Sequence, residues 1–105
     1  MSGFFVREGR KFSWDDKKNS LNQTKHGIRF ELASYVFDDG DALCVDDPCP
    51  DERRYRTIGM IGPVCIFVVW TEREDPDDSD NSIVRIISAR RAGSNERRCY
   101  EEGIE

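Results

Sequence analysis

The sequence lacks the features that mark metalloproteins, membrane proteins and secreted proteins. It has one histidine, His26, and only four cysteines, of which the closest two, Cys44 and Cys49, have four residues between them. Structural zinc sites use closer pairs and a second pair of ligands, so we expect neither a metal nor another cofactor. The longest apolar run, residues 64–70, is far shorter than the roughly 20 residues that span a bilayer. No apolar signal segment is visible either, which favours a cytoplasmic protein away from membranes.

Length and composition predict one small domain. The chain has 105 residues, of which 37% are hydrophobic and 35% are charged, and a chain of this size supports a single modest core. Residues 12–105 are predicted to form that domain. Residues 1–11 form an N-terminal arm, in which residues 4–6 either add a strand or stay disordered.

Charge is distributed unevenly along the chain, whose net charge is -5. Residues 38–52 hold seven acids and no base, and residues 72–80 hold six acids and one arginine. Such runs are typical of solvated loops. Residues 85–98 instead hold five arginines and one acid. An acidic chain is not a natural nucleic-acid binder, but its basic C-terminal third can bind nucleic acid locally.

The pattern of apolar residues predicts an α+β fold. One helix starts at Asp16, capped by Ser13 or Asp15, and ends at Gly27; a second covers about residues 31–37. Strands follow at residues 42–45, 54–61, 64–72 and 83–89, with a tight turn at Gly62–Pro63 and a long polar loop at residues 75–82. A last helix, capped by Ser94, covers about residues 95–102. Hairpin turns imply an antiparallel sheet of about four strands.

Short motifs in a fixed order resemble the BrnT-type toxins of bacterial type II toxin–antitoxin systems. The N-terminal motif is Trp14-Asp15, Lys18, Asn22, Lys25-His26-Gly27 and Phe30-Glu31. The middle motifs are Glu52, Arg54, Ile58-Gly59 and Thr71-Glu72-Arg73. The C-terminal motif is Ile86-Ile87-Ser88-Ala89-Arg90, Ala92, Glu96-Arg97 and Tyr100. The chain departs from the family in residues 1–11 and in the acidic residues 75–80, where a shorter, less charged turn is common.

The resemblance implies a metal-independent ribonuclease with a RelE-like fold that inhibits translation by cutting RNA. It also implies a BrnA-like antitoxin of the ribbon-helix-helix class, which neutralises the toxin and carries it to operator DNA. Such cleavage needs a base for the 2′-hydroxyl, cations for the phosphorane and an acid for the leaving oxygen. The candidate catalytic residues in matching motif positions are Lys25, His26, Glu52, Arg54, Arg73 and Arg90.

Each candidate has a plainer interpretation. An imidazole can act as base or acid in proton transfer, which suits His26, but a histidine before a helix-ending glycine also interacts with the last carbonyl groups. Glu52 is the other candidate base. Lys25 either binds phosphate or belongs to a solvated helix face. Arg90 either binds phosphate or pairs with the antitoxin or a local carboxylate. Trp70 is either a core residue or a platform for a base.

The predicted hairpins limit which candidates can meet. A tight turn at Gly62–Pro63 places Arg54 opposite about Thr71. A second hairpin then brings Arg85 to the same end of the sheet, so Arg54, Glu72, Arg73 and Arg85 are predicted to cluster. Arg90 lies about five residues further along its strand, roughly 17 Å away at ~3.4 Å per residue. Arg73 and Arg90 are therefore not expected to share one phosphate.

Two other functions fit the same residues. A toxin homologue without activity would serve as an antitoxin-binding co-repressor, which the net charge of -5 and the acidic residues 75–80 favour. A metal-binding regulator would use Cys44, Cys49 and His26.

Overall fold

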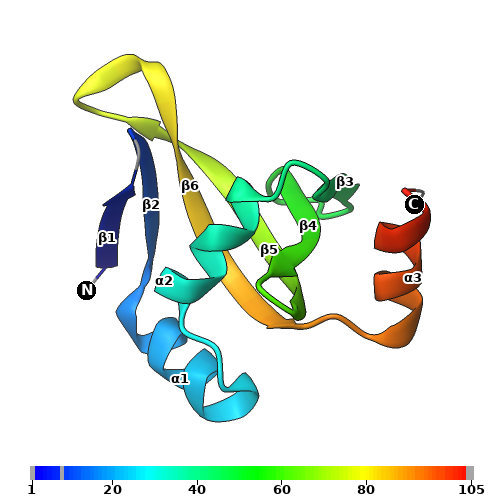
Figure 1. Ribbon diagram of the computed structural model, residues 1–105. Coiled ribbons are helices and arrows are strands. Elements are labelled where there is room, and N and C mark those ends of the chain that lie inside the picture. Colours follow the sequence, from blue (N-terminus) through cyan, green and yellow to red (C-terminus); the bar gives the residue numbers. More distant parts are fainter. Residues whose placement is uncertain (1, 8, 104–105) are drawn as a thin grey trace.

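Strands from both ends of the sequence meet in one mixed sheet (Figure 1). The protein is seen in a computed structural model, which describes residues 2–7 and 9–103. Within these residues the strands are β1 (Ser2–Arg7), β2 (Arg10–Asp15), β3 (Leu43–Asp47), β4 (Arg54–Ile61), β5 (Val64–Asp75) and β6 (Asp78–Arg91). The helices are α1 (Asp16–His26), α2 (Phe30–Ala33), the 3-10 helix η1 (Ser34–Asp38) and α3 (Ser94–Glu102). The strand order is β1-β2-β6-β5-β4-β3, and β2 and β6 are the parallel pair.

The helices α1, α2 and η1 cover one face of this sheet, which we call the helix face. Its core contains fully buried aromatic side chains such as Phe12 and Phe30, packed on Val68 and Ile86 of the central strands. Asn22 of α1 is also buried, and its amide exchanges hydrogen bonds with the backbone of Ala89 on β6, at 2.7 Å and 3.2 Å. A buried amide with its partners satisfied fixes the helix on the strand.

The ends of α1 follow the predicted signals. The Asp15 carboxylate accepts hydrogen bonds from Lys17 N at 2.9 Å and Lys18 N at 3.2 Å, as an N-cap does. Gly27 ends the helix with a φ of 73°, in the left-handed region that favours glycine. The single predicted helix over residues 31–37 is instead α2 followed by η1.

The opposite face carries α3 at one end, and we call it the open face. There α3 lies on Ile58, Cys65 and Phe67. Tyr100 donates a 2.6 Å hydrogen bond to Asp39, which raises the pKa of Tyr100 to about 12. Gly93, not the predicted Ser94, occupies the N-cap position of α3, and its N–H donates to Glu96 at 2.7 Å.

Three predictions about the sheet were wrong. The described residues form six strands rather than about four, because residues from the arm build β1 and the start of β2. The sheet is not purely antiparallel, because β2 enters beside β6 in the same direction. Residues 75–82 are not a long loop, because β5 and β6 continue to a short turn. Asp75 is buried there and its carboxylate lies 2.6 Å from Lys11 Nζ on β2, so this polar hairpin is tied to the sheet.

The predicted β4–β5 hairpin is confirmed. Ile61 pairs with Val64 across Gly62 and Pro63, and Gly62 has a φ of 57°. No helix in residues 2–7 and 9–103 is long and apolar enough to cross a membrane.

Candidate active site

A row of polar residues crosses four neighbouring strands on the open face. Arg54 on β4 pairs with Thr71 on β5, Thr71 pairs with Arg85 on β6, and Arg85 pairs with Ser13 on β2. Residues directly opposite one another in paired strands point to the same side of a sheet. Thr71 also lies on the same face as Phe67, four residues earlier, which contacts the α3 side of the core. The row therefore lies on the part of the open face beyond α3.

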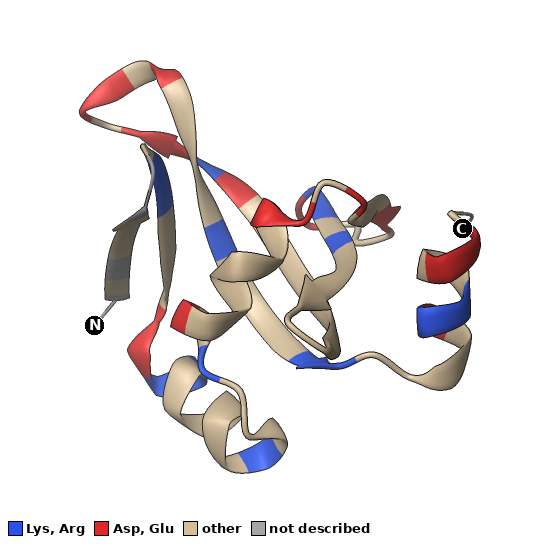
Figure 2. Ribbon diagram, in the orientation of Figure 1, with Lys and Arg blue, Asp and Glu red and all other residues tan. Residues whose placement is uncertain are grey.

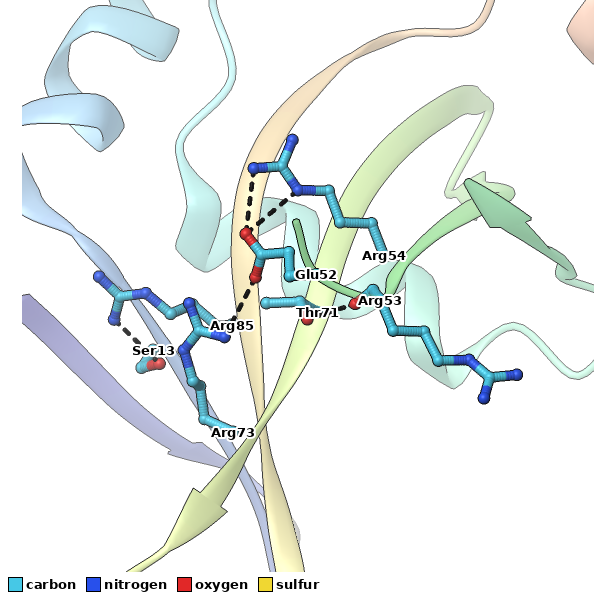
Figure 3. A network of polar contacts seen from close by, with 7 residues as sticks. All are labelled: Ser13, Glu52, Arg53, Arg54, Thr71, Arg73 and Arg85. Carbon is cyan, nitrogen blue, oxygen red and sulfur yellow. Dashed lines mark hydrogen bonds and ion pairs between the residues drawn. The ribbon is translucent and has the colours of Figure 1, made fainter. Parts of the chain in front are cut away.

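Glu52 binds two arginines of this face at once (Figure 3). Its Oε2 accepts from Arg54 Nη2 at 3.1 Å, and its Oε1 accepts from Arg73 Nη1 at 3.1 Å. The preceding loop is held because the buried Thr71 hydroxyl donates to the carbonyl oxygen of Arg53 at 2.6 Å. We call Glu52, Arg54, Arg73 and Arg85 the Glu52 cluster.

The electrostatics of the Glu52 cluster favour an anionic ligand. Hydrogen bonds from Arg54 and then from Arg73 lower the pKa of Glu52 below its ordinary value, so it is ionised at neutral pH. The same bond to Glu52 raises the pKa of Arg54. Three guanidinium groups against one carboxylate leave positive charge on this surface. Acidic residues instead gather at the tip of the β5–β6 hairpin (Figure 2).

The predicted cluster is confirmed for three of its four members. The registers place Arg54 opposite Thr71 and Arg85, with Arg73 two residues further along β5. Arg85 donates to Ser13 Oγ at 3.4 Å, and it belongs with the candidates although its motif position alone did not select it. Glu72 was wrongly included, because side-chain alternation turns it to the helix face. There it lines a cavity with Phe37 and Trp70.

Lys25 and His26 do not meet the Glu52 cluster. Both lie in the last turn of α1, directly before the left-handed Gly27. The helix α1 packs on the helix face through Asn22 and Ala89, whereas the Glu52 cluster lies on the open face. Lys25 is exposed and His26 is half-buried. Their position fits the helix-end interpretation of both residues.

Arg90 forms a separate ion pair, away from the Glu52 cluster. It makes two hydrogen bonds to the Glu96 carboxylate, at 2.7 Å and 2.6 Å, and its guanidinium lies 4.2 Å from the centre of the Phe67 ring. Arg90 pairs with Phe67 while Arg85 pairs with Thr71, so the two arginines are four residues of β5 apart. That is roughly 14 Å at ~3.4 Å per residue. Of the alternatives for Arg90, the structure shows pairing with a local carboxylate, that of Glu96. This pair joins β6 to α3.

The cysteines are dispersed. Cys65 is buried under α3, Cys44 is exposed and Cys49 is half-buried. Among the residues that the structure describes, no three His, Cys, Asp or Glu side chains lie together as ligands for a metal ion.

A family model described as the ribonuclease toxin BrnT of type II toxin–antitoxin systems matches residues 14–96. The chain belongs to the BrnT family. The match includes both the Glu52 cluster and the Arg90–Glu96 pair. Membership in BrnT makes the protein a toxin of a type II system, a class with ribonuclease activity, RNA targets and a cognate antitoxin. A search of curated proteins finds no match to this BrnT chain.

Proposed function

We propose that this toxin cleaves RNA at the Glu52 cluster without a metal ion. The observation that carries the proposal is one carboxylate held between two arginines, on an open strand row that supplies a third arginine. Arginine forks match the geometry of phosphate oxygens and stay protonated at all relevant pH values. A positioned carboxylate is a suitable general base.

In the proposed step Glu52 takes the proton of a ribose 2′-hydroxyl, whose oxygen attacks the adjacent phosphorus. The bond from phosphorus to the 5′-oxygen breaks, and that oxygen takes a proton from solvent. The products carry a 2′,3′-cyclic phosphate and a 5′-hydroxyl. Arg54, Arg73 and Arg85 stabilise the charge that develops on the phosphorane oxygens.

The ion pairs around Glu52 adjust its basicity. In the free protein Arg54 and Arg73 lower the pKa of Glu52, which keeps it deprotonated and makes it a weak base. A phosphate bound by the same arginines takes part of their hydrogen bonding. The pKa of Glu52 then rises toward its ordinary range, so substrate binding strengthens the base at the moment it is needed.

The proposal extends to the partners that the resemblance implies. They are a BrnA-like ribbon-helix-helix antitoxin and, through that antitoxin, operator DNA. The fold is expected to be RelE-like and the cellular effect to be inhibition of translation in the cytoplasm. The family match over residues 14–96 supports these expectations.

The test is cleavage by purified, antitoxin-free protein in EDTA. Wild-type protein should cut RNA and leave cyclic phosphate ends, and Glu52→Gln should not. Glu101→Gln is the matched control, because Glu101 pairs with Arg97 on the exposed side of α3, away from the Glu52 cluster. If the wild-type protein neither cuts RNA nor arrests growth on induction, the proposed activity is wrong.

The net charge of -5 and the acidic β5–β6 hairpin favour a second candidate, an inactive homologue that binds the antitoxin and represses the operator. In that case induction is harmless, while pull-down from cells still recovers a ribbon-helix-helix protein and the pair still binds operator DNA.

A further inference from the structure

Three aromatic side chains with an arginine at each end form a row on the helix face, two of them from strands β4 and β5 and one from η1. Tyr55 stacks on Trp70 with ring centres 4.7 Å apart, and Trp70 meets Phe37 edge-on at 5.3 Å. The Arg53 guanidinium lies 5.7 Å from the Tyr55 ring, and that of Arg10 lies 5.8 Å from the Phe37 ring. We call these five residues the aromatic run. All three rings are half-buried, so each keeps some surface for a ligand.

A cavity of about 590 Å³ opens beside the aromatic run, with Phe37 and Trp70 in its wall. This volume lies within the range of pockets that hold small organic ligands. Polar groups reach the same cavity from Arg10, Glu72 and Asn81. Trp70 Nε1 donates to Thr57 Oγ1 at 2.8 Å, which fixes the orientation of the indole ring. The wall therefore combines two aromatic side chains, of which Trp70 is held in a fixed orientation, with polar side chains that line the same cavity.

We propose that this cavity binds one nucleobase of the RNA that the Glu52 cluster cleaves, an inference that rests on the proposed function. Proteins recognise single-stranded RNA by stacking unpaired bases on aromatic rings and arginine planes, and by hydrogen bonds to the base edges. The aromatic run supplies the rings and the arginines. Glu72 supplies an acceptor that reads the base.

Glu72, one of the residues that line the cavity, limits which base fits. An ionised carboxylate only accepts hydrogen bonds. Glu72 therefore selects a base that presents N–H donors. Guanine has two adjacent donors on its Watson–Crick edge and can bind both carboxylate oxygens, so it is the base assigned to this cavity.

The cavity and the Glu52 cluster are connected at the start of β4. Arg53 and Arg54 are neighbours in sequence, and their side chains extend apart in Figure 3. Arg54 binds Glu52 on the open face, while Arg53 lies over Tyr55 of the aromatic run. An RNA strand that passes the end of β4 thus meets an arginine on each side of the sheet.

Charges near the cavity favour RNA over a basic peptide. A cationic side chain on the aromatic wall would meet the guanidinium of Arg10, which already lies over Phe37. Asp78 also lines the cavity, but its carboxylate accepts hydrogen bonds from Asn81 Nδ2 at 2.7 Å and from Asp80 N at 3.0 Å. Its negative charge is therefore already partly satisfied within the hairpin.

Tryptophan fluorescence reports occupancy directly, because Trp14 is only 3% exposed and Trp70 is half-buried. The probe is a short RNA with 2′-O-methyl riboses, which cannot attack their phosphates and so is not cleaved. Wild-type protein should show quenching on addition of this RNA, and Trp70→Phe, which retains Trp14, should not. Quenching that persists in Trp70→Phe, or that an oligoarginine peptide produces and RNA does not, overturns the proposal.

Base selection is tested with Glu72→Gln. The amide replaces an acceptor by a donor, so the Kd for a guanine-containing probe should rise about tenfold, with little change for a guanine-free probe. Glu74→Gln is the matched control, since Glu74 is equally exposed on β5 but lies outside the cavity. Equal Kd values for wild-type and Glu72→Gln protein on both probes overturn the assignment of Glu72.

The two proposals fail separately. If the protein cuts RNA but Trp70 does not respond to the probe, the cavity is not a subsite and the proposed ribonuclease stands. If Trp70 responds and no RNA is cut under any condition, the base-binding cavity stands and the catalytic proposal is wrong.

Discussion

Two arginine–glutamate groups lie on the open face of this sheet, and they differ in how completely the charges are matched. Arg90 and Glu96 form a closed pair with two short hydrogen bonds, and Glu96 also accepts the N–H of Gly93 at the start of α3. Glu52 is instead shared by Arg54 and Arg73, each through one carboxylate oxygen, and Arg85 lies on the same row. The first group sets one guanidinium against one carboxylate, whereas the second sets three guanidinium groups against one carboxylate.

Residue type alone does not separate a structural arginine from one proposed to bind phosphate. Arg90 lies over Phe67 and links β6 to α3, so we assign it to holding the helix. Arg54 and Arg73 lie at the open end of the β4–β5 hairpin, where their side chains are 33% and 50% exposed. The excess of guanidinium groups over carboxylates, and not the presence of arginine, is the reason for proposing the Glu52 cluster as the phosphate site.

The largest expected effect is that of Glu52→Gln on activity. Loss of a general base should lower the rate constant for RNA cleavage by about 10²- to 10⁴-fold. The same change at the other group, Glu96→Gln, should leave the rate constant nearly unchanged at a temperature where the protein is folded. Equal losses in the two variants would remove the distinction between the groups.

Arg54→Ala should lower the cleavage rate constant by about 10²-fold, because one donor to the phosphorane is lost. The fold should persist, since the Arg54 side chain is one-third exposed. Circular dichroism measures whether the variant is folded, and growth after induction measures whether it is still toxic. A folded Arg54→Ala protein that is still toxic would show that the Glu52 cluster is not the active site.

Arg90→Ala should act on stability. The variant loses two charge-assisted hydrogen bonds and the contact with Phe67, and we expect a decrease of about 1–2 kcal/mol in the free energy of unfolding, after allowance for the exposed side of the pair. Urea denaturation measures it. The cleavage rate constant should stay within about twofold of wild type at low temperature. The reason is that Arg90 lies roughly 14 Å from Thr71, too far to contact the same phosphate.

The smallest expected effect is a shift in the pH dependence of cleavage. Glu52 must be deprotonated to act as base, and Arg73 is one of the two groups that lower its pKa. In Arg73→Ala the pKa of Glu52 rises toward its ordinary value of 4.5, so activity should be lost at a higher pH on the acid side than in wild type. Arg97→Ala also removes one positive charge, but from α3, so it should not shift the pH dependence of cleavage.

The ion pairs of Glu52 and Glu96 also make the stability of the protein depend on pH. The folded-state pKa of Glu52 and that of Glu96 are both lowered, by Arg54 and Arg90 respectively as the largest causes. Their contribution to stability is therefore present above the unfolded pKa and is lost as the pH falls through the folded pKa. Acid unfolding of Glu96→Gln should show a smaller dependence on pH in that range.

Local signals predicted much of the fold. Asp15 and Gly27 set the ends of α1, and Gly62–Pro63 set the register that brings Arg54 beside Thr71 and Arg85. The prediction grouped Glu72 with Arg73 because the two are neighbours on one strand. That was wrong, because neighbouring side chains of a strand point to opposite faces of the sheet. The arm and the polar β5–β6 hairpin were harder to predict, because their strands are stabilised by distant partners such as the Lys11–Asp75 pair.

The sequence by itself determined the family, the helix ends and the central hairpin, because each depends on residues close together in the chain. Only the tertiary structure decided that β2 lies parallel to β6, that Glu96 closes on Arg90, and that Glu52 bridges Arg54 and Arg73. Those arrangements depend on packing between segments far apart in sequence, where any of several arginines and carboxylates could have paired. The fold selects among them by placing some on a shared strand row and turning others to the opposite face.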